Sequence, residues 1–312
     1  MAKVILTKTR SFSTEEIGET VSGALDLLNY DFKCTIDSVI IKPNLCYYWD
    51  YSTGQTTDPR VVSAVIDWVR QKLGKDICIS IAEADASAMR TKYAFKMLGY
   101  EKLSQKKKVE LVNLSEGEIV EKEVVSAGKK LALPVNKILL DTNLLINVPK
   151  LKYHRTIGFT CALKNIFGAI SKPKKYVYHN RLAHIIAGIN KIVRTNIALV
   201  DGIVVAGKTP KKLGVAMASD NVVACDFIAA KAIGCEPFRV EYLKLALKEK
   251  LGDVNDLHLI ENSVKLSVVR KDFPKQNFRV QKLLWKMQLG MLKMYSKVTG
   301  DIIPPILWEN NR

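Results

Sequence analysis

The first half of this chain alternates short runs of β-branched and other apolar residues with longer segments whose apolar residues recur at helical spacing. The runs KVILT, SVIIKPN and ICISIAEA and the segment 109–114 predict strands, and the segments 15–28, 59–73 and 89–98 predict helices. This order is typical of βαβ units around a parallel sheet. The charged segment 118–134 has no clear period, and we expect it to form an inserted hairpin.

The same alternation returns after residue 140. Strands are expected at 143–148, 196–200 and 214–218, and helices at 157–170, 179–193 and 221–233. In the first of these helices the apolar residues recur from Phe159 to Ile170 at helical spacing, which indicates one buried stripe. Ser219 or Asp220 is expected to cap the last helix, and Gly234 to end it. We predict an α/β fold with two doubly wound parallel-sheet lobes, residues 1–140 and 141–265.

The C-terminal segment 266–312 has a different character and is expected to form a helical extension. Residues 265–312 contain ten Lys or Arg and three acidic residues, and their apolar residues keep a helical stripe that includes Leu283, Met287 and Met294. A basic amphipathic helix of this kind can dock on its own domain or on a second subunit. It can also lie on an anionic membrane surface, and the sequence leaves these alternatives open.

The remainder of the chain carries no signal of a secreted or membrane protein. Its N-terminus returns to Lys and Arg after four residues, and no run approaches the roughly 18 apolar residues that span a bilayer. The six cysteines form no CxxC pair, so we interpret them as reduced thiols and expect no metal site built from them. These observations favour a cytoplasmic protein.

The chain is strongly basic, and the charge is concentrated in one stretch. Its formal net charge is +17, and its 48% hydrophobic composition is sufficient for a globular core. Residues 142–200 contain ten Lys or Arg, three of the four histidines and no acidic residue, where the average composition would give about six. A solvated basic face is the simple alternative. Because a site without internal counter-charge attracts anions, we expect an anionic ligand here.

One sequence motif in this region is misleading. Residues 202–209, GIVVAGKT, match the phosphate-binding P-loop pattern. A P-loop must open a helix at its Lys and Thr, so that successive backbone N–H groups point at phosphate. Here Pro210 follows Thr209 and another strand-like run begins shortly afterwards. The sequence therefore does not predict a nucleoside triphosphate site at this motif.

Polar side chains stand at the ends of several expected strands. Lys42 and Asn44 follow one strand, Glu83 follows the next, and Lys150 and Asp201 follow two later ones. In open α/β sheets ligands bind beyond the carboxyl ends of the strands, so side chains far apart in sequence can converge there. For each residue alone, an ordinary role in a loop is the alternative, such as a turn at Asn44 or a local backbone contact at Asp201.

Taken together, several segments resemble one family. The segments IKPNL, TTDPRVV, NVPKLKYHRTIGFTCALKNIFGAI and IALVDG are similar to the KPN, TxP, PKxKxH, LKNxFG and VDG signatures of the domain-of-unknown-function family numbered 362, in the same order. The resemblance covers residues 4–235 and implies no established activity. Many members carry a ferredoxin-type cysteine cluster, which implies an iron–sulfur association, but this chain has no cysteine after Cys235. If the family core transfers electrons, the resemblance implies that this chain obtains them from a partner.

A weaker likeness concerns the order of elements only. The succession of strand, TxP loop, helix and strand is similar to that in the amino-terminal domain of lactate racemase, which binds a phosphorylated nickel cofactor. No residue match carries the catalytic histidines of that enzyme over to this chain. The likeness implies only an anionic cofactor between two α/β lobes.

We expect the chain to bind a phosphorylated or carboxylated small molecule, with redox or isomerase chemistry unspecified and no cofactor identified. His154 and His184 are the candidate acids or bases, because imidazole titrates near neutral pH. A surface-loop role for His154 and a structural role for His184 are the alternatives. The candidate ligand-binding residues are Lys42, Asn44, Thr57, Lys150, Lys152, Lys164, Asn165 and Asp201.

Two other functions stay open at this point. The chain can be a redox or maturation subunit that works with an iron–sulfur electron-transfer partner, as the family association implies. A non-enzymatic nucleic-acid binder would also explain the charge. Nucleic-acid surfaces usually interleave aromatic residues with basic ones, however, and only Tyr153, Tyr176 and Tyr178 lie near the basic stretch. The sequence therefore makes nucleic acid the less favoured partner.

Overall fold

One eight-stranded, mostly parallel sheet organises the molecule. The computed structural model describes residues 2–45, 47–87, 89–154 and 157–275 and the positions 287, 290, 291 and 294. The strand order is β12-β1-β11-β10-β7-β2-β3-β4, and only the pairs β1–β11 and β10–β11 are antiparallel. The strands of this sheet are β1 (Ala2–Lys8), β2 (Ser38–Pro43), β3 (Cys78–Glu83), β4 (Glu110–Asn113), β7 (Leu144–Val148), β10 (Ile197–Val205), β11 (Lys211–Ser219) and β12 (Leu257–Glu261).

The predicted α/β class is confirmed, with a correction to the two lobes. The strands expected in two separate sheets lie in one sheet, because β7, from the second half of the chain, pairs in parallel with β2 from the first. N-terminal β1 inserts between β11 and β12. The hydrogen bonds of these pairs use the backbone N–H and C=O groups of strands that would be unpaired edge strands in two separate sheets.

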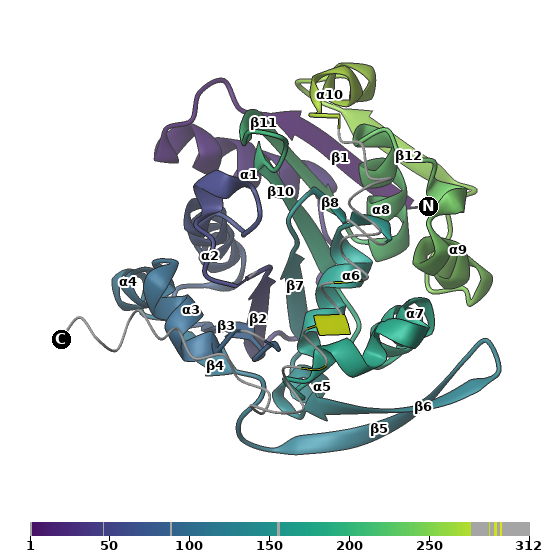
Figure 1. Cartoon of the computed structure of the whole chain (residues 1–312). Helices are drawn as coiled ribbons and strands as arrows, with labels where there is room; N and C mark the ends of the chain where they lie inside the picture. The colour runs from purple at the N-terminus through teal and green to yellow at the C-terminus, as the bar shows by residue number, and fades with distance from the viewer. Residues whose placement is uncertain are drawn as a thin grey trace.

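Helices cover both faces of the sheet, which gives three layers (Figure 1). Along β2, Val39 and Ile41 belong to one apolar core and Ile40 belongs to the other, because successive side chains of a strand point to opposite faces. On the first face lie α1 (Thr14–Leu28), α2 (Pro59–Leu73), α3 (Thr91–Met97) and α4 (Tyr100–Lys107), and on the second lie α6 (Ala162–Ile166), α7 (Leu182–Ile192), α8 (Val222–Ala232) and α9 (Glu241–Lys248).

The expected inserted hairpin is present. Strands β5 (Ile119–Ser126) and β6 (Lys129–Asn136) pair antiparallel across a two-residue turn. Both turn residues, Ala127 and Gly128, have positive φ, as a type I′ turn requires. The apolar side of the hairpin packs on α7, where a Cβ at Gly188 would come within 3.0 Å of Leu131 Cδ1. The short helix α5 (Ile138–Asp141) then leads into β7.

The helix predicted over residues 157–170 is wrong in its first part. The chain forms a small hairpin there from β8 (Lys152–His154) and β9 (Gly158–Thr160), and α6 follows, continued by the 3₁₀ helix η2 (Phe167–Ala169). Gly158 has a φ of 78°, which an α-helix cannot include. The buried carboxylate of Asp226 accepts hydrogen bonds from the backbone N–H groups of Ala162 and Leu163, so it fixes the helix start at Ala162. The apolar stripe itself is buried as predicted.

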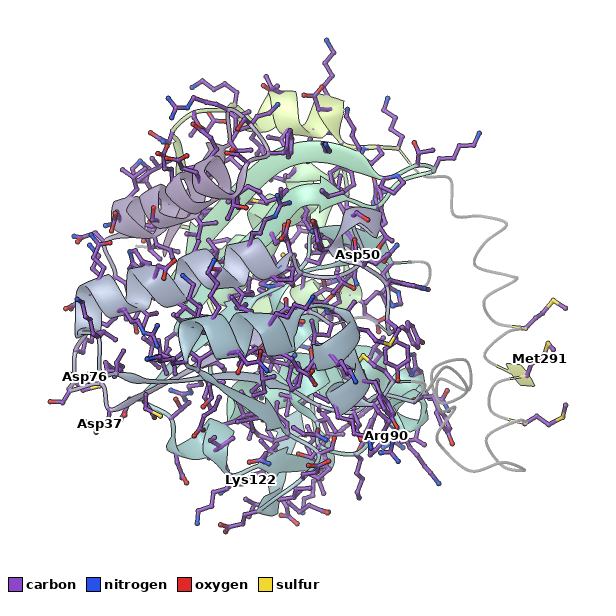
Figure 2. The ribbon with its side chains drawn as sticks, turned by 90° about the vertical axis from the view of Figure 1, so that its left-hand side faces the viewer. Asp37, Asp50, Asp76, Arg90, Lys122 and Met291 are labelled. Carbon is purple, nitrogen blue, oxygen red and sulfur yellow. The ribbon has the colours of Figure 1, made fainter. Side chains whose placement is uncertain are left out.

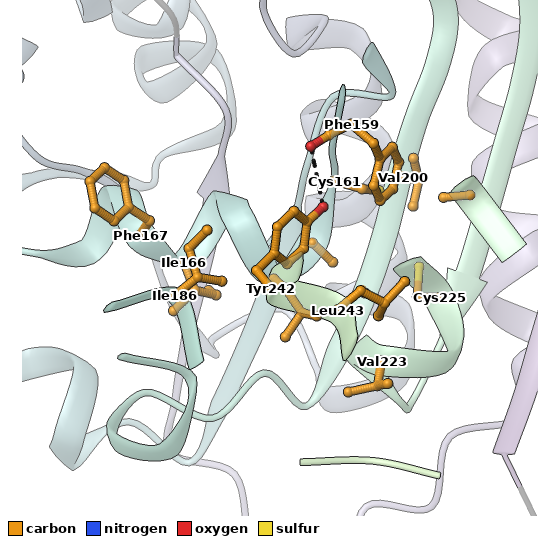
Figure 3. Close-up of a cluster of buried hydrophobic side chains, with 14 of the residues drawn as sticks. Phe159, Cys161, Ile166, Phe167, Ile186, Val200, Val223, Cys225, Tyr242 and Leu243 are labelled. Carbon is orange, nitrogen blue, oxygen red and sulfur yellow. Dashed lines mark hydrogen bonds between the residues drawn. The ribbon is translucent and has the colours of Figure 1, made fainter. Parts of the chain in front are cut away.

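The apolar core that packs against β9 and α6 contains aromatic rings and two buried thiols (Figure 3). The rings of Phe159 and Tyr242 are stacked at 6.3 Å, and the Tyr242 hydroxyl donates a hydrogen bond to the Phe159 carbonyl over 3.4 Å. Cys161 and Cys225 are buried beside them. Burial raises the pKa of the Cys161 thiol well above its ordinary value, and a hydrogen bond with Cys225 acts in the same direction.

The other predicted strands and helices are present, although β10 and β11 are longer than predicted and the sequence did not predict α4, α9 or β12. Helix α8 is capped by Asn221, whose side chain accepts from two backbone N–H groups, instead of the expected Ser219 or Asp220. The false P-loop lies in strand β10 and in its turn to β11, so its residues open no helix. The remaining short elements are η1 (Tyr51–Thr53), η3 (Lys175–Arg181), η4 (Pro237–Arg239) and α10 (Leu266–Asp272).

The predicted amphipathic extension lies mostly outside the described residues. Helix α10 covers its beginning, and the stripe residues Met287, Met291 and Met294 have exposed side chains. Within the ranges that the structure describes, no helix is long and apolar enough to cross a membrane.

Candidate functional site: a basic cleft at the strand ends

A cleft of about 830 Å³ opens at the carboxyl ends of β2 and β3. Figure 2 shows the polarity of these strands: Asp37 and Asp76, which precede them, lie at one side of the molecule, and Asp50 and Arg90, which follow them, lie at the other. The cleft is also lined from β8, α6, η2, η3 and the turn between β10 and β11. It lies where an open α/β sheet is expected to bind its ligand.

A buried ion pair joins the ends of the two strands. Lys42 Nζ lies 2.8 Å from Glu83 Oε1, and the two side chains are 0% and 4% exposed. The same carboxylate accepts from the backbone N–H groups of Ala84 and Leu45, and Lys42 also donates to the Pro43 carbonyl. Each charge is therefore both paired and hydrogen-bonded, as burial of an ion pair requires.

A chain of side-chain hydrogen bonds links β8, the loop after β2, α6 and β7. Lys152 Nζ donates to Asn44 Oδ1 at 2.8 Å, Asn44 Nδ2 donates to Asn165 Oδ1 at 2.9 Å, and Asn165 Nδ2 donates to Asn147 Oδ1 at 2.7 Å. Asn147 completes the series by donating to the Ala162 carbonyl. Because each of the three asparagines both accepts and donates, and Lys152 also donates to the Gln55 carbonyl, the network holds the Lys152 ammonium in one position at the cleft wall.

Gly168 brings two lysines together. A Cβ at this position would lie 2.9 Å from Lys42 Nζ and 3.1 Å from Glu83 Oε1, so only glycine allows η2 to pack on the ion pair. The Gly168 carbonyl accepts a 2.7 Å hydrogen bond from Lys175 Nζ. Burial lowers the pKa of Lys175 to about 8; Glu83 opposes this shift, and nearby Lys42 adds to it.

The wall formed by α6, η2 and η3 adds further cations and rings. The Lys164 ammonium lies 4.0 Å from the centroid of the Phe167 ring, a cation–π contact. His154 and His179 line the same space, and His179 Nδ1 is 3.2 Å from the Lys175 carbonyl oxygen. Tyr47 and Trp49 also line the cleft, and their rings lie 5.3 Å apart. The cleft therefore presents flat apolar surfaces beside positive charge.

Positive charge dominates the cleft. The described residues that line it include a single carboxylate, Glu83, and six lysines, which are Lys42, Lys152, Lys164, Lys175, Lys208 and Lys275. Lys208 belongs to the false P-loop, and it contributes a side chain to this cleft although its backbone forms no phosphate loop. The lining has the charge expected of an anion site.

Six of the ten predicted site residues meet in this cleft. They are Lys42, Asn44, Lys152, His154, Lys164 and Asn165, from four different elements or loops. The structure brings together side chains up to 123 residues apart, as between Lys42 and Asn165. Lys42 and Asn44 lie at the end of β2, as the strand-end argument expected, whereas Lys164 and Asn165 reach the cleft from α6.

Three predicted ligand-binding residues do not line the cleft. Lys150 and Asp201 form an ion pair of 2.8 Å in which neither side chain is exposed. Asp201 also accepts from the backbone N–H groups of Asp58 and Ile203, and burial raises its pKa although Lys150 acts in the other direction. Thr57 is fully buried and donates to the Val148 carbonyl. These residues connect the loops beneath the site.

His184 also lies elsewhere. It stands in the first turn of α7, and its Nδ1 is 3.2 Å from the Ser126 carbonyl oxygen at the tip of the β5–β6 hairpin. This contact agrees with a structural role for His184, the alternative to a catalytic one. The sequence could not separate the two histidines, because both lie in the same acid-free stretch.

Several cleft residues were not among the predicted ones. Glu83 could have been predicted, since it is a polar residue at the end of a strand. Lys175 and His179 lie in the 3₁₀ helix η3, and the predicted helix 179–193 included only the second of them. Lys208 was set aside with the P-loop pattern. Their convergence depends on the path of the chain after Pro173, which no local pattern reveals.

The described residues contain no group of three or more His, Cys, Asp or Glu placed to hold a metal ion. Of the cysteines they include, Cys34 and Cys78 are exposed, Cys161 and Cys225 are buried, and Cys235 is partly buried. Cys46 lies outside the described residues. None of the described residues that line the cleft is a cysteine.

Comparison with known proteins supports a family relationship. The family model described as "Domain of unknown function (DUF362)" matches residues 39–231, which is more than half of the chain. The match includes the strand ends and the α6–η2 segment that build the cleft.

Two individual proteins are similar over much of the chain. The "Thylakoid-associated protein sll1697" of a Synechocystis strain is 26% identical over 229 residues, which are 69% of this chain and 68% of that protein. The lactate racemase apoprotein from Thermoanaerobacterium thermosaccharolyticum superimposes with a TM-score of 0.49 at 17% identity. That match covers 73% of this chain and spans 56% of the racemase chain.

Proposed function

The chain belongs to the family described as Domain of unknown function (DUF362), and we propose that it uses the cleft at the strand ends to bind an anionic small molecule that carries a phosphate or carboxylate group. The observation that carries this proposal is the composition of the lining, which among the described residues has six lysines and one carboxylate around a space of about 830 Å³. A volume of this size accommodates a cofactor-sized molecule.

The surroundings assign different roles to the lysines. Lys42 is paired with Glu83 and fixes the cleft floor, whereas Lys152 and Lys164 present ammonium groups at the wall. We assign the anionic group of the ligand to Lys152 and Lys164. The Tyr47 and Trp49 rings and the Phe167 ring supply surfaces for an apolar or planar part of the ligand.

His154 is the proposed general acid or base of this site. It lines the cleft two residues after Lys152, so a ligand held by Lys152 lies within reach of its imidazole. An imidazole changes protonation near neutral pH and can move a proton to or from a bound molecule. Strand β8 ends at His154 and places this residue in the cleft lining, which the proposed role requires.

Titration with inorganic pyrophosphate tests the binding proposal. We expect pyrophosphate to raise the melting temperature of the wild-type protein progressively with the logarithm of its concentration above Kd, because it binds only the folded cleft. Lys164→Gln should weaken its binding by about tenfold or more, since a charge-assisted hydrogen bond contributes roughly 1.5 to 3 kcal/mol. Lys172→Gln is the matched control, because Lys172 is an exposed lysine outside the lining.

Two results would contradict the proposal. One is an equal loss of affinity in the Lys164 and Lys172 variants, which would show that the general positive charge binds the anion. The other is a single-stranded oligonucleotide that binds more tightly than pyrophosphate and remains bound in the Lys164→Gln variant. That result would favour the nucleic-acid alternative.

A further inference from the structure

Lys175 differs from the other lysines of the cleft in how its amine is held. Its side chain is only 7% exposed, yet it lines the cleft, and its Nζ is oriented by a 2.7 Å hydrogen bond to the Gly168 carbonyl. A buried lysine amine usually serves a carboxylate partner. Here the carboxylate next to it, Glu83, is engaged at 2.8 Å by Lys42.

We propose that Lys175 is a nucleophile that forms an imine with a carbonyl compound bound in the cleft. The inference rests on the proposed function, because the same cleft lysines would hold the phosphate or carboxylate of that compound. The ligand class is therefore an aldehyde or ketone that also carries an anionic group. Its carbonyl carbon would lie at Lys175, and its anionic group would lie toward Lys164.

The surroundings of Lys175 favour an uncharged amine. The ammonium form is disfavoured by burial and by the positive charge of Lys42, while Glu83 and Asp85 favour it. The pKa of Lys175 is lowered to about 8 as a result, so a useful fraction of the amine is unprotonated near neutral pH. The Lys42–Glu83 pair and the glycine at position 168 produce this environment, because η2 could not pack so closely with a Cβ.

The covalent step needs no further reagent. The lone pair of the Lys175 amine attacks the carbonyl carbon, and a C–N bond forms as the C–O double bond becomes a single bond. The two hydrogens of the amine leave with the carbonyl oxygen as water, and the C–N bond becomes the double bond of the imine. The burial of Lys175 favours a lasting imine, because limited access of water slows its hydrolysis.

Reductive trapping with two aldehydes tests the proposal. The full chain is incubated with pyridoxal 5′-phosphate or with pyridoxal, which lacks the phosphate, and reduced with borohydride. Intact and peptide mass spectrometry then locate the adduct. We expect one dominant adduct at Lys175, formed at least tenfold faster with the phosphorylated aldehyde and suppressed by pyrophosphate.

Matched variants separate the covalent step from anion binding. Lys175→Arg keeps a positive charge but should abolish the dominant adduct, whereas Lys172→Arg should leave it unchanged. Lys164→Gln should slow trapping by the phosphorylated aldehyde and leave trapping by pyridoxal unaffected. If the arginine variant fails to fold, the wild-type pH profile decides, since trapping at Lys175 should be half-maximal near pH 8.

Each outcome has one meaning. Labelling spread over many exposed lysines, or a Lys175 profile that rises only near pH 10, would overturn the role of Lys175 while leaving the anion site intact. Equal trapping by both aldehydes at Lys175 would support the nucleophile and contradict the anion site. Pyrophosphate binding without any Lys175 adduct would support the anion site and contradict the role of Lys175 as a nucleophile.

Discussion

Lys150 and Asp201, separated by 51 residues in the chain, form an ion pair of 2.8 Å that is completely removed from solvent. The backbone supports the pair, because the Leu151 N–H donates to the Asp201 carbonyl and the Asp201 N–H donates to the Pro149 carbonyl. The contact joins the loop after β7 to β10 directly beneath the cleft. Its role is to hold this part of the sheet together.

Removal of Lys150 should therefore affect stability more than binding. Lys150→Met leaves a buried carboxylate without its partner, which is expected to cost about 3 to 5 kcal/mol of unfolding free energy. The loss should be smaller at acid pH, where Asp201 can be protonated. Urea denaturation measures it, with Lys172→Met expected within about 0.5 kcal/mol of the wild type. A Lys150 variant of wild-type stability at neutral pH would show that the pair is dispensable.

A methyl group at position 168 should disturb the floor of the cleft. Gly168→Ala places a Cβ 2.9 Å from Lys42 Nζ, and such overpacking is expected to cost about 1 to 3 kcal/mol. Gly18→Ala is the matched control. Gly18 lies inside α1 with open space around it, so alanine should instead stabilise by about 0.5 to 1 kcal/mol. Thermal or urea denaturation of both variants measures the contrast, and a stabilised Gly168→Ala would contradict it.

The amide network can be tested with a nearly isosteric change. Asn165→Asp replaces the Nδ2 donor, which serves Asn147 Oδ1 and the Lys42 and Pro43 carbonyls, by a second acceptor. Unsatisfied buried groups cost about 1 to 3 kcal/mol each. The variant should be clearly destabilised at pH 7 and partly recover near pH 4, where a protonated Asp can donate again.

Asn143→Asp provides the comparison for that experiment. The side-chain oxygen of Asn143 accepts from the Asp37 N–H at a partly exposed site, and aspartate keeps this acceptor. Its unfolding free energy should remain within about 0.5 kcal/mol of the wild type. Equal effects of the two substitutions in chemical denaturation would mean that the direction of the Asn165 hydrogen bonds is unimportant.

Asp226 should make the protein less stable as the pH rises. Burial raises its pKa to about 7, while the backbone N–H groups of Ala162 and Leu163 oppose the shift. Between its ordinary pKa and pH 7, the folded state keeps a proton that the unfolded state releases. The folded state therefore binds more protons, and unfolding free energy falls by at most about 1.4 kcal/mol per pH unit in this window.

Denaturation between pH 4 and pH 8 tests that sign. Asp226→Asn cannot ionise, so its stability relative to the wild type should improve steadily up to about pH 7 and then level off. Asp67→Asn, at an exposed helix position, should keep the wild-type pH dependence because Asp226 is intact. A relative stability of Asp226→Asn that falls with pH would reverse the assignment.

The sequence by itself determined most of the strands and helices around the central sheet and the end of the sheet where polar groups meet. The continuous apolar runs at β2 and β3 identify strands buried on both faces, and the 3.6-residue spacing over α2 fixed a helix whose predicted bounds agree with the structure. These patterns are local, so they can be counted along the chain. The positions of Lys42, Asn44 and Lys152 followed from them, because parallel strands end at a common edge.

Only the tertiary structure decided which charges are compensated and which line the cleft. Residues 142–200 contain no acidic residue, but Lys150 finds its counter-charge in Asp201, one position beyond that window, and Lys42 finds its own in Glu83 on a neighbouring strand. An ion pair depends on the distance between two charges in space, whereas the composition of a sequence window reflects only which residues are close along the chain. The partial exposure of Lys164, the burial of Lys175 and the single sheet all depend on long-range packing, which no window of the sequence contains.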